Sequence, residues 1–357
     1  PTDENVMYIG TDMGVFKTTN GGATWYKFQW GLPSVPVTNL VYVPGTSGAP
    51  DTLRIGTYGR GFWQRVLSGD DPFFFLLTYI PYRGMDILED HGIAVGDEGR
   101  VAHTSDGGKT WAEGSSSTSS TLNSSRILDS LRRIAVGMSG SIARSTDGGS
   151  SWANVPSPVL SSFFDVFFTD PLNGSAVGDL GTIIHSTDGG QTWQTVMTGT
   201  NATLHSVFFT DPLNGWISGT DNSGQIPMVL LLHTTDGGSN WVPSLSVGPG
   251  GGCDVMFPDP NIGYLTLEGG GMMKTTDAGQ SWNQLQTGTQ LSLHDVFFTN
   301  PDNGWACGDG GVFIHTTDGG QQWMTEESGS DSNLYRIAMS NDHLFTAGAE
   351  GIFSKST

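Results

Sequence analysis

One eight-residue motif recurs along most of the chain at a nearly constant interval. It has the general form Thr/Ser-X-Asp-Gly-Gly-X-X-Trp, and from Trp111 onward its tryptophans are separated by 41, 41, 48, 41 and 41 residues. The six copies are residues 104–111, 145–152, 186–193, 234–241, 275–282 and 316–323. A seventh copy, residues 18–25, has Asn20 in place of the aspartate, and an insertion around residues 220–227 accounts for the longer interval. A fixed period of this length predicts an array of identical structural units.

Each repeat reads as four short strands. The unit that ends at Trp323 has an alternating run at 293–298, a turn at 300–304, and further runs at 305–308 and 312–315 before the motif. Runs of β-branched and aromatic residues between Asx and glycine turns predict strands. The 52 glycines among 357 residues fit a chain with many tight turns. Four strands in 41 residues predict one blade of a β-propeller.

The motif itself predicts a turn that fastens two strands together. Its Asp or Asn accepts backbone N–H groups of the same turn, its glycines take positive φ, and its tryptophan packs beside the hairpin. The structural residues expected from this pattern are Asp106, Trp111, Asp147, Trp152, Asp188, Trp193, Asp236, Trp241, Asp277, Trp282, Asp318 and Trp323.

With these motifs the sequence resembles the Asp-box (BNR) propellers, which occur in sialidases, sortilin-type receptors and some glucan-cleaving enzymes. The stretches 181–193 and 207–216 are similar, more specifically, to the seven-bladed propellers of photosystem II assembly and stability factors. That resemblance covers about residues 72–357 and implies an all-β propeller with four-stranded blades. It implies little about activity, because the Asp-box is found on propellers with unrelated activities.

Residues 72–357 hold seven repeats of about 41 residues, which predicts seven blades. The last repeat stops before a strand that bears a tryptophan, and residues 73–80 form an apolar run with no inner strands of their own. We expect the ring to close by exchange of this run into the last blade, because such an exchange removes exposed sheet edges.

Residues 1–68 differ from the later repeats. Their runs at 6–16, 18–28, 37–43 and 53–64 read as about one and a half blades, and residues 31–33 with 57–63 resemble the closing blade of a glucanase- or sialidase-type propeller. We expect residues 1–68 to be terminal blades of a preceding propeller-like unit, 69–71 the end of a linker, and 72–357 the propeller. One larger ring that includes residues 1–68 is the alternative.

Composition excludes two classes of partner. The chain has 35 acidic against 15 basic side chains and a formal net charge of −20, which opposes binding to nucleic acid and to anionic membranes. Its apolar runs are shorter than the roughly 20 residues that cross a bilayer, so no membrane insertion is expected. The first residues show no signal-peptide pattern, so an export signal is expected outside this sequence. Cys253 and Cys307 are too few for a disulfide framework and are expected as free thiols.

The chain shows no recognised catalytic or metal-binding motif. His103, His185, His233 and His315 recur at one repeat position and His205 and His294 at another, which indicates structural roles. No His-Glu-X-X-His, Cys-X-X-Cys or phosphate-binding loop motif is found, and no cofactor or metal is expected. The tripeptide from Tyr335 to Ile337 resembles the first arginine motif of sialidases, but Ala338 replaces its proline, so no catalytic residue is assigned.

One repeat position is charged rather than apolar. Alignment of the innermost strands places Asp165, Ser206, Asp254 and Asp295 together, with Arg336, Arg83 and Arg126 at or near that position in three neighbouring blades. This alignment predicts a central channel with one basic and one acidic wall. The charges either pair across the narrow channel or form a site for an anion or carboxylate. The charged residues Arg83, Arg126, Arg336, Asp165, Asp254 and Asp295 are the candidate ligand-binding residues.

We therefore expect a non-catalytic binding or scaffold propeller of an exported or cell-surface protein. Its partner is expected to be a protein or a glycan, within a larger multidomain chain or assembly. The acidic composition and scarce lysines favour an extracellular or periplasmic location. Two alternatives stay open: part of a glycan-cleaving enzyme of the sialidase or glucanase type, and, from the resemblance alone, an assembly factor for a membrane protein complex.

Overall fold

The computed structural model describes residues 5–11, 14–27, 37–43, 52–57, 61–66, 75–77, 81–108, 111–326, 328, 331–340, 343–349 and 351–356. It consists of two compact units, Pro1–Ile80 and Pro81–Thr357. Regular structure in the described residues is β-strand, interrupted by five single turns of 3-10 helix. Among these residues there is no helix of the length and apolar character needed to cross a membrane.

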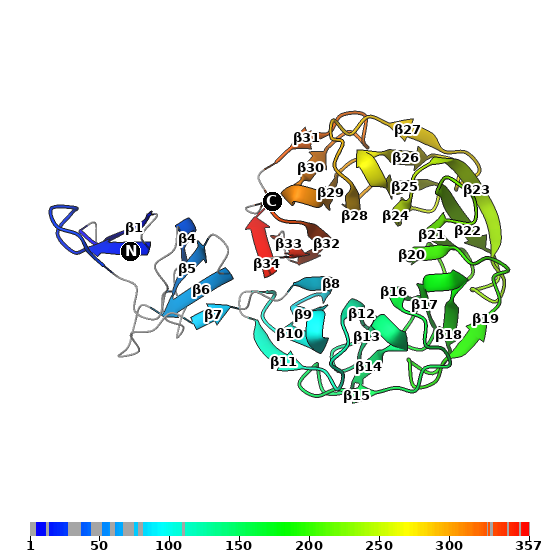
Figure 1. The fold of residues 1–357 in the computed structure, drawn as a ribbon, viewed down its shortest axis with the longest axis horizontal. Coiled ribbons are helices and arrows are strands. Elements are labelled where there is room, and N and C mark those ends of the chain that lie inside the picture. The colour runs from blue at the N-terminus through cyan, green and yellow to red at the C-terminus, as the bar shows by residue number, and fades with distance from the viewer. Residues whose placement is uncertain are drawn as a thin grey trace. The chain divides into compact units, whose positions relative to one another are not determined.

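The second unit is a β-propeller, and the described residues form seven blades around a central opening (Figure 1). Each blade is an antiparallel sheet whose strands follow one another in chain order, with the first strand innermost. The expected all-β propeller with four-stranded blades is confirmed.

The strands of the first four blades have the following bounds. Blade 1 consists of β8 (Tyr82–Leu88), β9 (His91–Gly96), β10 (Arg100–Thr104) and β11 (Ala112–Ser115), and blade 2 of β12 (Leu122–Ile127), β13 (Arg133–Gly137), β14 (Ile142–Ser145) and β15 (Ala153–Asn154). Blade 3 consists of β16 (Phe163–Phe168), β17 (Gly174–Gly178), β18 (Ile183–Ser186) and β19 (Gln194–Val196), and blade 4 of β20 (Thr203–Phe209), β21 (Gly215–Asp221), β22 (Met228–Thr234) and β23 (Val242–Pro249). The insertion around residues 220–227 lengthens the hairpin of β21 and β22, which pair as far as Asp221 and Met228.

The remaining three blades complete the ring. Blade 5 consists of β24 (Gly252–Asp259), β25 (Ile262–Leu267), β26 (Met272–Thr275) and β27 (Asn283–Leu285), and blade 6 of β28 (Leu293–Phe298), β29 (Gly304–Gly308), β30 (Phe313–Thr316) and β31 (Met324–Thr325). Blade 7 has three strands in the described residues, β32 (Leu334–Ser340), β33 (His343–Gly348) and β34 (Gly351–Ser356).

A tight corner joins the second and third strands in five of the blades. These corners are η1 (Asp97–Gly99), η2 (Met138–Gly140), η3 (Asp179–Gly181), η4 (Glu268–Gly270) and η5 (Asp309–Gly311). Each ends in a glycine with positive φ, as at Gly181 with a φ of 66°, where an added Cβ would collide with the carbonyl oxygen of Thr200. The corner therefore requires glycine both for its backbone conformation and for space.

The apolar core lies between the blades. Blades 3 and 4, for example, share one buried cluster that contains Val177 and Ile183 on one side and Leu204, Val207 and Ile217 on the other. Since each sheet buries its faces against its neighbours, the ring is stable only when it closes.

The ring closes between blades 7 and 1. The innermost strands are in contact in sequence around the ring, and β32 contacts β8. Tyr82 and Met85 of blade 1 form a buried cluster with Phe345 of blade 7, and the hydroxyl of Ser340 donates a hydrogen bond of 2.6 Å to the carbonyl oxygen of Glu89. The first and last inner strands of the second unit therefore meet after seven blades.

The first unit contains two sheets in the described residues. The first sheet is formed by β1 (Met7–Thr11), β2 (Gly14–Thr18) and β3 (Tyr26–Lys27), and the second by β4 (Val37–Val43), β5 (Thr52–Thr57), β6 (Gly61–Val66) and β7 (Phe75–Leu77). The hydroxyl of Thr18 donates to the side chain of Asn20 at 2.8 Å, so the seventh motif forms the same kind of turn as the others.

The strand expected to close the propeller lies in this first unit instead. β7 pairs antiparallel with β6, with Leu77 opposite Phe62 and Phe75 opposite Gln64, so the predicted exchange into blade 7 is wrong for this strand. Pairing across a short loop costs less chain entropy than pairing with the far end of the chain. Residues 73–74 and 78–80 of the expected strand, and the expected linker at 69–71, lie outside the described residues.

Candidate functional site

The innermost strand of each blade carries a β-bulge at the same place. The bulged residues are Arg83, Asn123, Phe164, His205, His294 and Tyr335, and in blade 5 the irregular segment contains Cys253 and Asp254. The position directly after the bulge is occupied by Gly84, Ser124, Asp165, Ser206, Asp295 and Arg336, with Asp254 as their counterpart in blade 5. A bulge redirects the side chains that follow it, and here, in every blade but the first, it sets a polar residue at the same level of the channel.

This register corrects the sequence-based placement of two arginines. Arg83 is one residue before the shared position, which Gly84 occupies in blade 1, and Arg126 is two residues after it, since Ser124 occupies it in blade 2. The turns between the first two strands differ in length among the blades. A sequence alignment that starts from these turns therefore places both arginines at the wrong position of the strand. Of the three arginines expected on the basic wall, Arg336 occupies the shared position itself.

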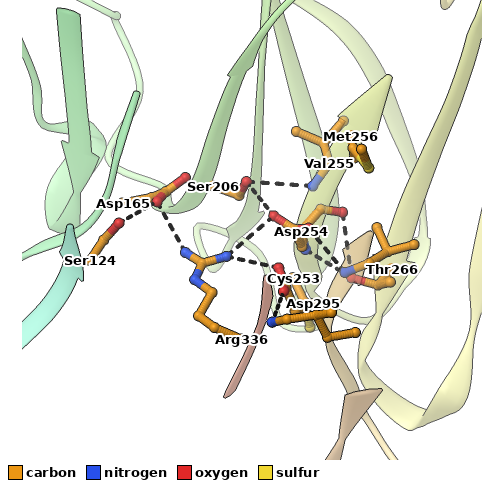
Figure 2. A network of polar contacts seen from close by, with 12 residues as sticks. Ser124, Asp165, Ser206, Cys253, Asp254, Val255, Met256, Thr266, Asp295 and Arg336 are labelled. Carbon is orange, nitrogen blue, oxygen red and sulfur yellow. Dashed lines mark hydrogen bonds and ion pairs between the residues drawn. The ribbon is translucent and has the colours of Figure 1, made fainter. Parts of the chain in front are cut away.

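Arg336 lies in the channel among three carboxylates (Figure 2). Its Nη2 is 3.0 Å from Oδ1 of Asp165, and its Nη1 is 3.0 Å from Oδ1 of Asp295 and 3.6 Å from Oδ1 of Asp254. Arg336 comes from blade 7 and Asp165 from blade 3, so the contact crosses the channel. The geometry is that of internal charge pairing.

The same carboxylates satisfy open backbone groups of the next blade. The innermost strand of a blade has an unpaired edge, whose N–H groups need acceptors. The second oxygen of each carboxylate accepts such an N–H group, from Val207 to Asp165 at 3.0 Å, from Val296 to Asp254 at 3.2 Å and from Ile337 to Asp295 at 2.5 Å. Each aspartate therefore links its blade to the following one.

The cluster holds more acidic than basic groups. Burial, followed by the charge of Asp295, raises the pKa of Asp254 well above its usual range, and the hydroxyl of Ser206 donates to this carboxyl at 2.6 Å. Burial alone would lower the pKa of Arg336, but the charges of Asp165, Asp295 and Asp254 outweigh it and raise that pKa. Arg336 therefore stays charged, and the raised pKa of Asp254 favours the protonated carboxyl, which would reduce the surplus negative charge.

Arg83 belongs to a different contact. Its Nε is 2.5 Å from Oδ1 of Asp97 and its Nη2 is 3.2 Å from Oδ2. Its guanidinium also lies 5.5 Å from the ring centroid of Tyr335, within the range of a cation–π interaction.

Arg126 of blade 2 is held by groups of its two neighbouring blades. Its Nε donates to the carbonyl oxygen of Val166 at 3.0 Å, its Nη1 is 3.5 Å from Oδ1 of Asp86, and its guanidinium lies 5.1 Å from the ring centroid of Phe167. Asp86 also accepts the N–H of Ile127 at 2.7 Å, which is the same link between blades that the three channel aspartates make. Sequence reasoning missed Asp86 because it lies two residues beyond the aligned position.

A cavity of about 150 Å³ lies on the channel axis next to the cluster. Arg336 and the three aspartates form part of its lining, and Phe167, Phe208 and Phe297 form another part. The candidate ligand-binding residues Arg336, Asp165, Asp254, Asp295 and Arg126 meet at this cavity, whereas Arg83 is not part of its lining.

The six motif turns share one hydrogen-bond pattern. In the turn of blade 3, the hydroxyl of Ser186 donates to Asp188 at 2.9 Å and accepts the N–H of Gly190 at 2.9 Å, and Asp188 accepts the N–H of Thr192 at 2.9 Å. The corresponding hydroxyl groups of the other blades donate to Asp106, Asp147, Asp236, Asp277 and Asp318 at 2.7 to 2.9 Å. Trp193 and Trp241 are buried, and Trp111, Trp152, Trp282 and Trp323 are half-buried.

The histidine and cysteine side chains form no metal centre in the part of the chain that the structure describes, where no three His, Cys, Asp or Glu side chains are grouped to hold a metal ion. Burial lowers the pKa of His205 to about 4, and His294 contacts Asp309 at 2.7 Å. Cys253 and Cys307 are free thiols, and burial raises the pKa of Cys253 to about 12. A thiol with so high a pKa is a poor nucleophile at neutral pH.

Comparison with known proteins gives one family. The family model described as photosynthesis system II assembly factor YCF48 matches residues 144–289 and 284–357. Two similar solved structures are YCF48 bound to D1 peptide and YCF48 from Cyanidioschyzon merolae, each 22% identical in sequence, with TM-scores of 0.66 and 0.65. Each covers 79% of this chain, and the match covers 95% and 97% of the respective chains.

A third similar structure is the computationally designed Ika8 protein, with a TM-score of 0.58 and 10% identity over 90% of this chain and 96% of that chain. No curated protein matches. At these identities the likeness to solved structures shows the propeller fold.

Proposed function

Since the chain belongs to the photosystem II assembly factor YCF48 family, we propose that it is a non-catalytic, protein-binding propeller that acts as an assembly factor for a membrane protein complex. The family match covers more than half of the chain and lies within the seven-bladed ring.

The pairing of Arg336 is the observation that carries the non-catalytic part of the proposal. A sialidase-like site needs three arginines that converge on a substrate carboxylate. Here Arg336 is held by Asp165, Asp254 and Asp295, while Arg83 and Arg126 contact other carboxylates. The side chains that would bind the substrate are engaged in holding the blades together.

A protein partner is supported by the similar structure of YCF48 bound to D1 peptide. We propose that this chain likewise binds a peptide segment of a protein rather than a glycan, in a compartment outside the cytoplasm. The net charge of −20, with five lysines in the whole chain, supports selective binding to a neutral or basic segment, because an acidic one would be repelled.

Titration calorimetry with the full chain and the D1 peptide tests the proposal. We expect saturable binding with a dissociation constant in the micromolar range, and at least about tenfold weaker binding of a peptide with the same composition in scrambled order. Absence of heat change with the D1 peptide would contradict the assembly-factor proposal. Release of sugar from a sialoside or a β-glucan by the purified chain would contradict the non-catalytic one.

A further inference from the structure

The second strand of each of the first six blades places one side chain in the gap between that blade and the next. By strand register these residues are Ile93, Ile134, Ser175, Trp216, Tyr264 and Trp305, each opposite a residue of the third strand. Five of the six are large apolar or aromatic residues. Blade 3 has Ser175, which leaves this gap, here called the interblade slot, without a large side chain.

Blades 4 and 5 show how the slot is filled when an aromatic residue is present. The ring centroid of Trp216 lies 4.0 Å from that of His233 in its own blade, at an interplanar angle of 20°. The ring centroid of Trp216 also lies 5.3 Å from that of Phe257 of blade 5, at an interplanar angle of 18°. Tyr264 stacks in the same manner on Phe298 of blade 6, at 3.9 Å. The slot is therefore shaped for a flat ring.

The slot between blades 3 and 4 has the same walls. Ser175 is opposite His185, just as Trp216 is opposite His233. The other wall is Phe209, which packs against its blade as Phe257 does. A Cβ added to Gly215 would meet the ring of Phe209 at 2.7 Å, and one added to Gly263 would meet the ring of Phe257 at 2.5 Å.

The space beside the glycine of the motif turn in the next blade shows directly that a ring is missing. A Cβ added to Gly279 of blade 5 would collide with the ring of Trp216, whereas one added to Gly238 of blade 4 would lie 3.3 Å from the hydroxyl oxygen of Ser175. The serine hydroxyl therefore stands where the neighbouring blade has an indole.

The absent ring leaves a cavity of about 200 Å³, lined by Ser175, His185 and Phe209 among others. A second cavity of about 200 Å³ shares His185 and Ser239 with the first. An apolar protein cavity of about 150 Å³ is known to admit benzene, so the first cavity is large enough for a single aromatic ring.

The polar lining of the cavity indicates what kind of ring fits. Asp170 and Asp236 are part of the lining, and hydrogen bonds from Asn173 and Asn240 lower their respective pKa values, so both are ionised at neutral pH. Burial lowers the pKa of His185, whose imidazole is therefore neutral. A neutral ring with an N–H or O–H donor gains acceptors here, whereas an anionic ligand is repelled.

We propose that the slot between blades 3 and 4 is a binding site for a tryptophan or tyrosine side chain of a partner protein. The ring inserts between His185 and Phe209, in the place that Trp216 occupies in the next blade, and its polar hydrogen faces Asp170 or Asp236. This proposal deepens the proposed function and rests on it for the statement that the partner is a protein. The presence of the site is tested separately.

Saturation-transfer NMR with the full chain and N-acetyltryptophanamide, a neutral blocked tryptophan, tests the site. We expect binding in the millimolar range and at least about tenfold weaker binding of N-acetylleucinamide. Ser175→Trp places an indole of the protein itself in the slot. It should weaken binding of the probe at least about tenfold, without lowering the melting temperature. Ser175→Ile, which copies Ile93 and Ile134, gives the same test with a smaller side chain. Ser175→Ala leaves the slot open and should bind within about twofold of the parent.

Two results would overturn the site. One is the absence of saturation transfer from the parent at about 10 mM probe. The other is equal binding of the probe by the parent and by whichever of Ser175→Trp and Ser175→Ile folds. A chain that binds the D1 peptide but not the probe retains the proposed function and loses the slot. A chain that binds the probe but not the D1 peptide retains the slot and loses the proposed function.

Discussion

At the scale of single residues, the channel shows how a buried cation and surplus carboxylates are tolerated together. The three partners raise the pKa of Arg336, which therefore keeps its charge, and burial raises the pKa of Asp254, which favours its protonated form. Removing one member of such a network leaves an unpaired buried charge, which costs more than the intact network contributes. The arrangement therefore favours one specific position of the blades.

The protonation of Asp254 leads to a prediction about pH. Between the unfolded pKa of about 3.9 and the raised folded value, the native chain binds more protons at this site than the unfolded chain. The free energy of unfolding contributed by Asp254 therefore decreases as pH rises through that window. Asp254→Asn binds no proton, yet its amide can donate to Ser206 and accept from Val296. We expect urea unfolding to show that the variant gains stability relative to the parent as pH increases.

Asp147→Asn is the matched control, because the shift at Asp147 has the opposite sign. Hydrogen bonds from Ser151 and Ser145 lower the pKa of Asp147 to about 2, so its contribution is present above the unfolded pKa and is lost only as pH falls toward about 2. Its difference from the parent should not change between about pH 5 and pH 8. If the free energies of unfolding of Asp254→Asn and of the parent changed in parallel with pH over that range, Asp254 would not be the group that holds the proton.

At the scale of one element, the motif turn combines hydrogen bonds with ring packing. Trp193 is buried, and its ring meets Phe168 edge-on at a centroid distance of 5.9 Å. Asp188 is half-buried and contributes through bonds within the turn, such as the one from Thr192 Oγ1 at 2.6 Å. The two residues of one turn therefore contribute by different physical means.

This difference predicts unequal effects of two substitutions. Trp193→Ala should lower the free energy of unfolding by about 3 to 5 kcal/mol, as for other large buried aromatic residues. Asp188→Ala should lower it by about 1 to 2 kcal/mol through lost turn bonds. Denaturant unfolding of both variants checks the order. A Trp193→Ala protein within about 0.5 kcal/mol of the parent would refute the packing account.

At the scale of the whole molecule, closure depends on the contact of β32 with β8. The first unit does not lend β7 to the ring, because that strand pairs with β6. We propose that residues 1–68 are terminal blades of another propeller-like unit and that the ring folds without them.

Truncation tests this independence. Deletion of residues 1–80 should leave a folded monomer with a cooperative melt, because all seven inner strands are retained. Deletion of residues 1–88 also removes β8 and should expose sheet edges and cause aggregation. Size-exclusion chromatography and thermal melts distinguish the two proteins. Aggregation of the shorter deletion, residues 1–80, would show that the first unit is needed for closure.

The repeat, the four-stranded blade and the turn chemistry can be predicted from the amino-acid sequence. These features depend on residues a few positions apart, such as Ser186 and Asp188. They can therefore be recognised in the sequence of any single repeat. The identity of the fold followed from counting those repeats. The shared position of Asp165, Ser206 and Asp295 was also visible in alignment.

Which of these residues come into contact depends on how the chain folds in three dimensions. Arg336 and Asp165 are 171 positions apart and come into contact only because the ring closes, and Arg83 and Arg126 left the aligned position because turns of different length shifted the register. The open slot beside Ser175 is likewise defined by a wall from the next blade. Contacts between blades depend on closure and register, which short-range patterns do not encode, and so the charged cluster and the slot became visible only in three dimensions.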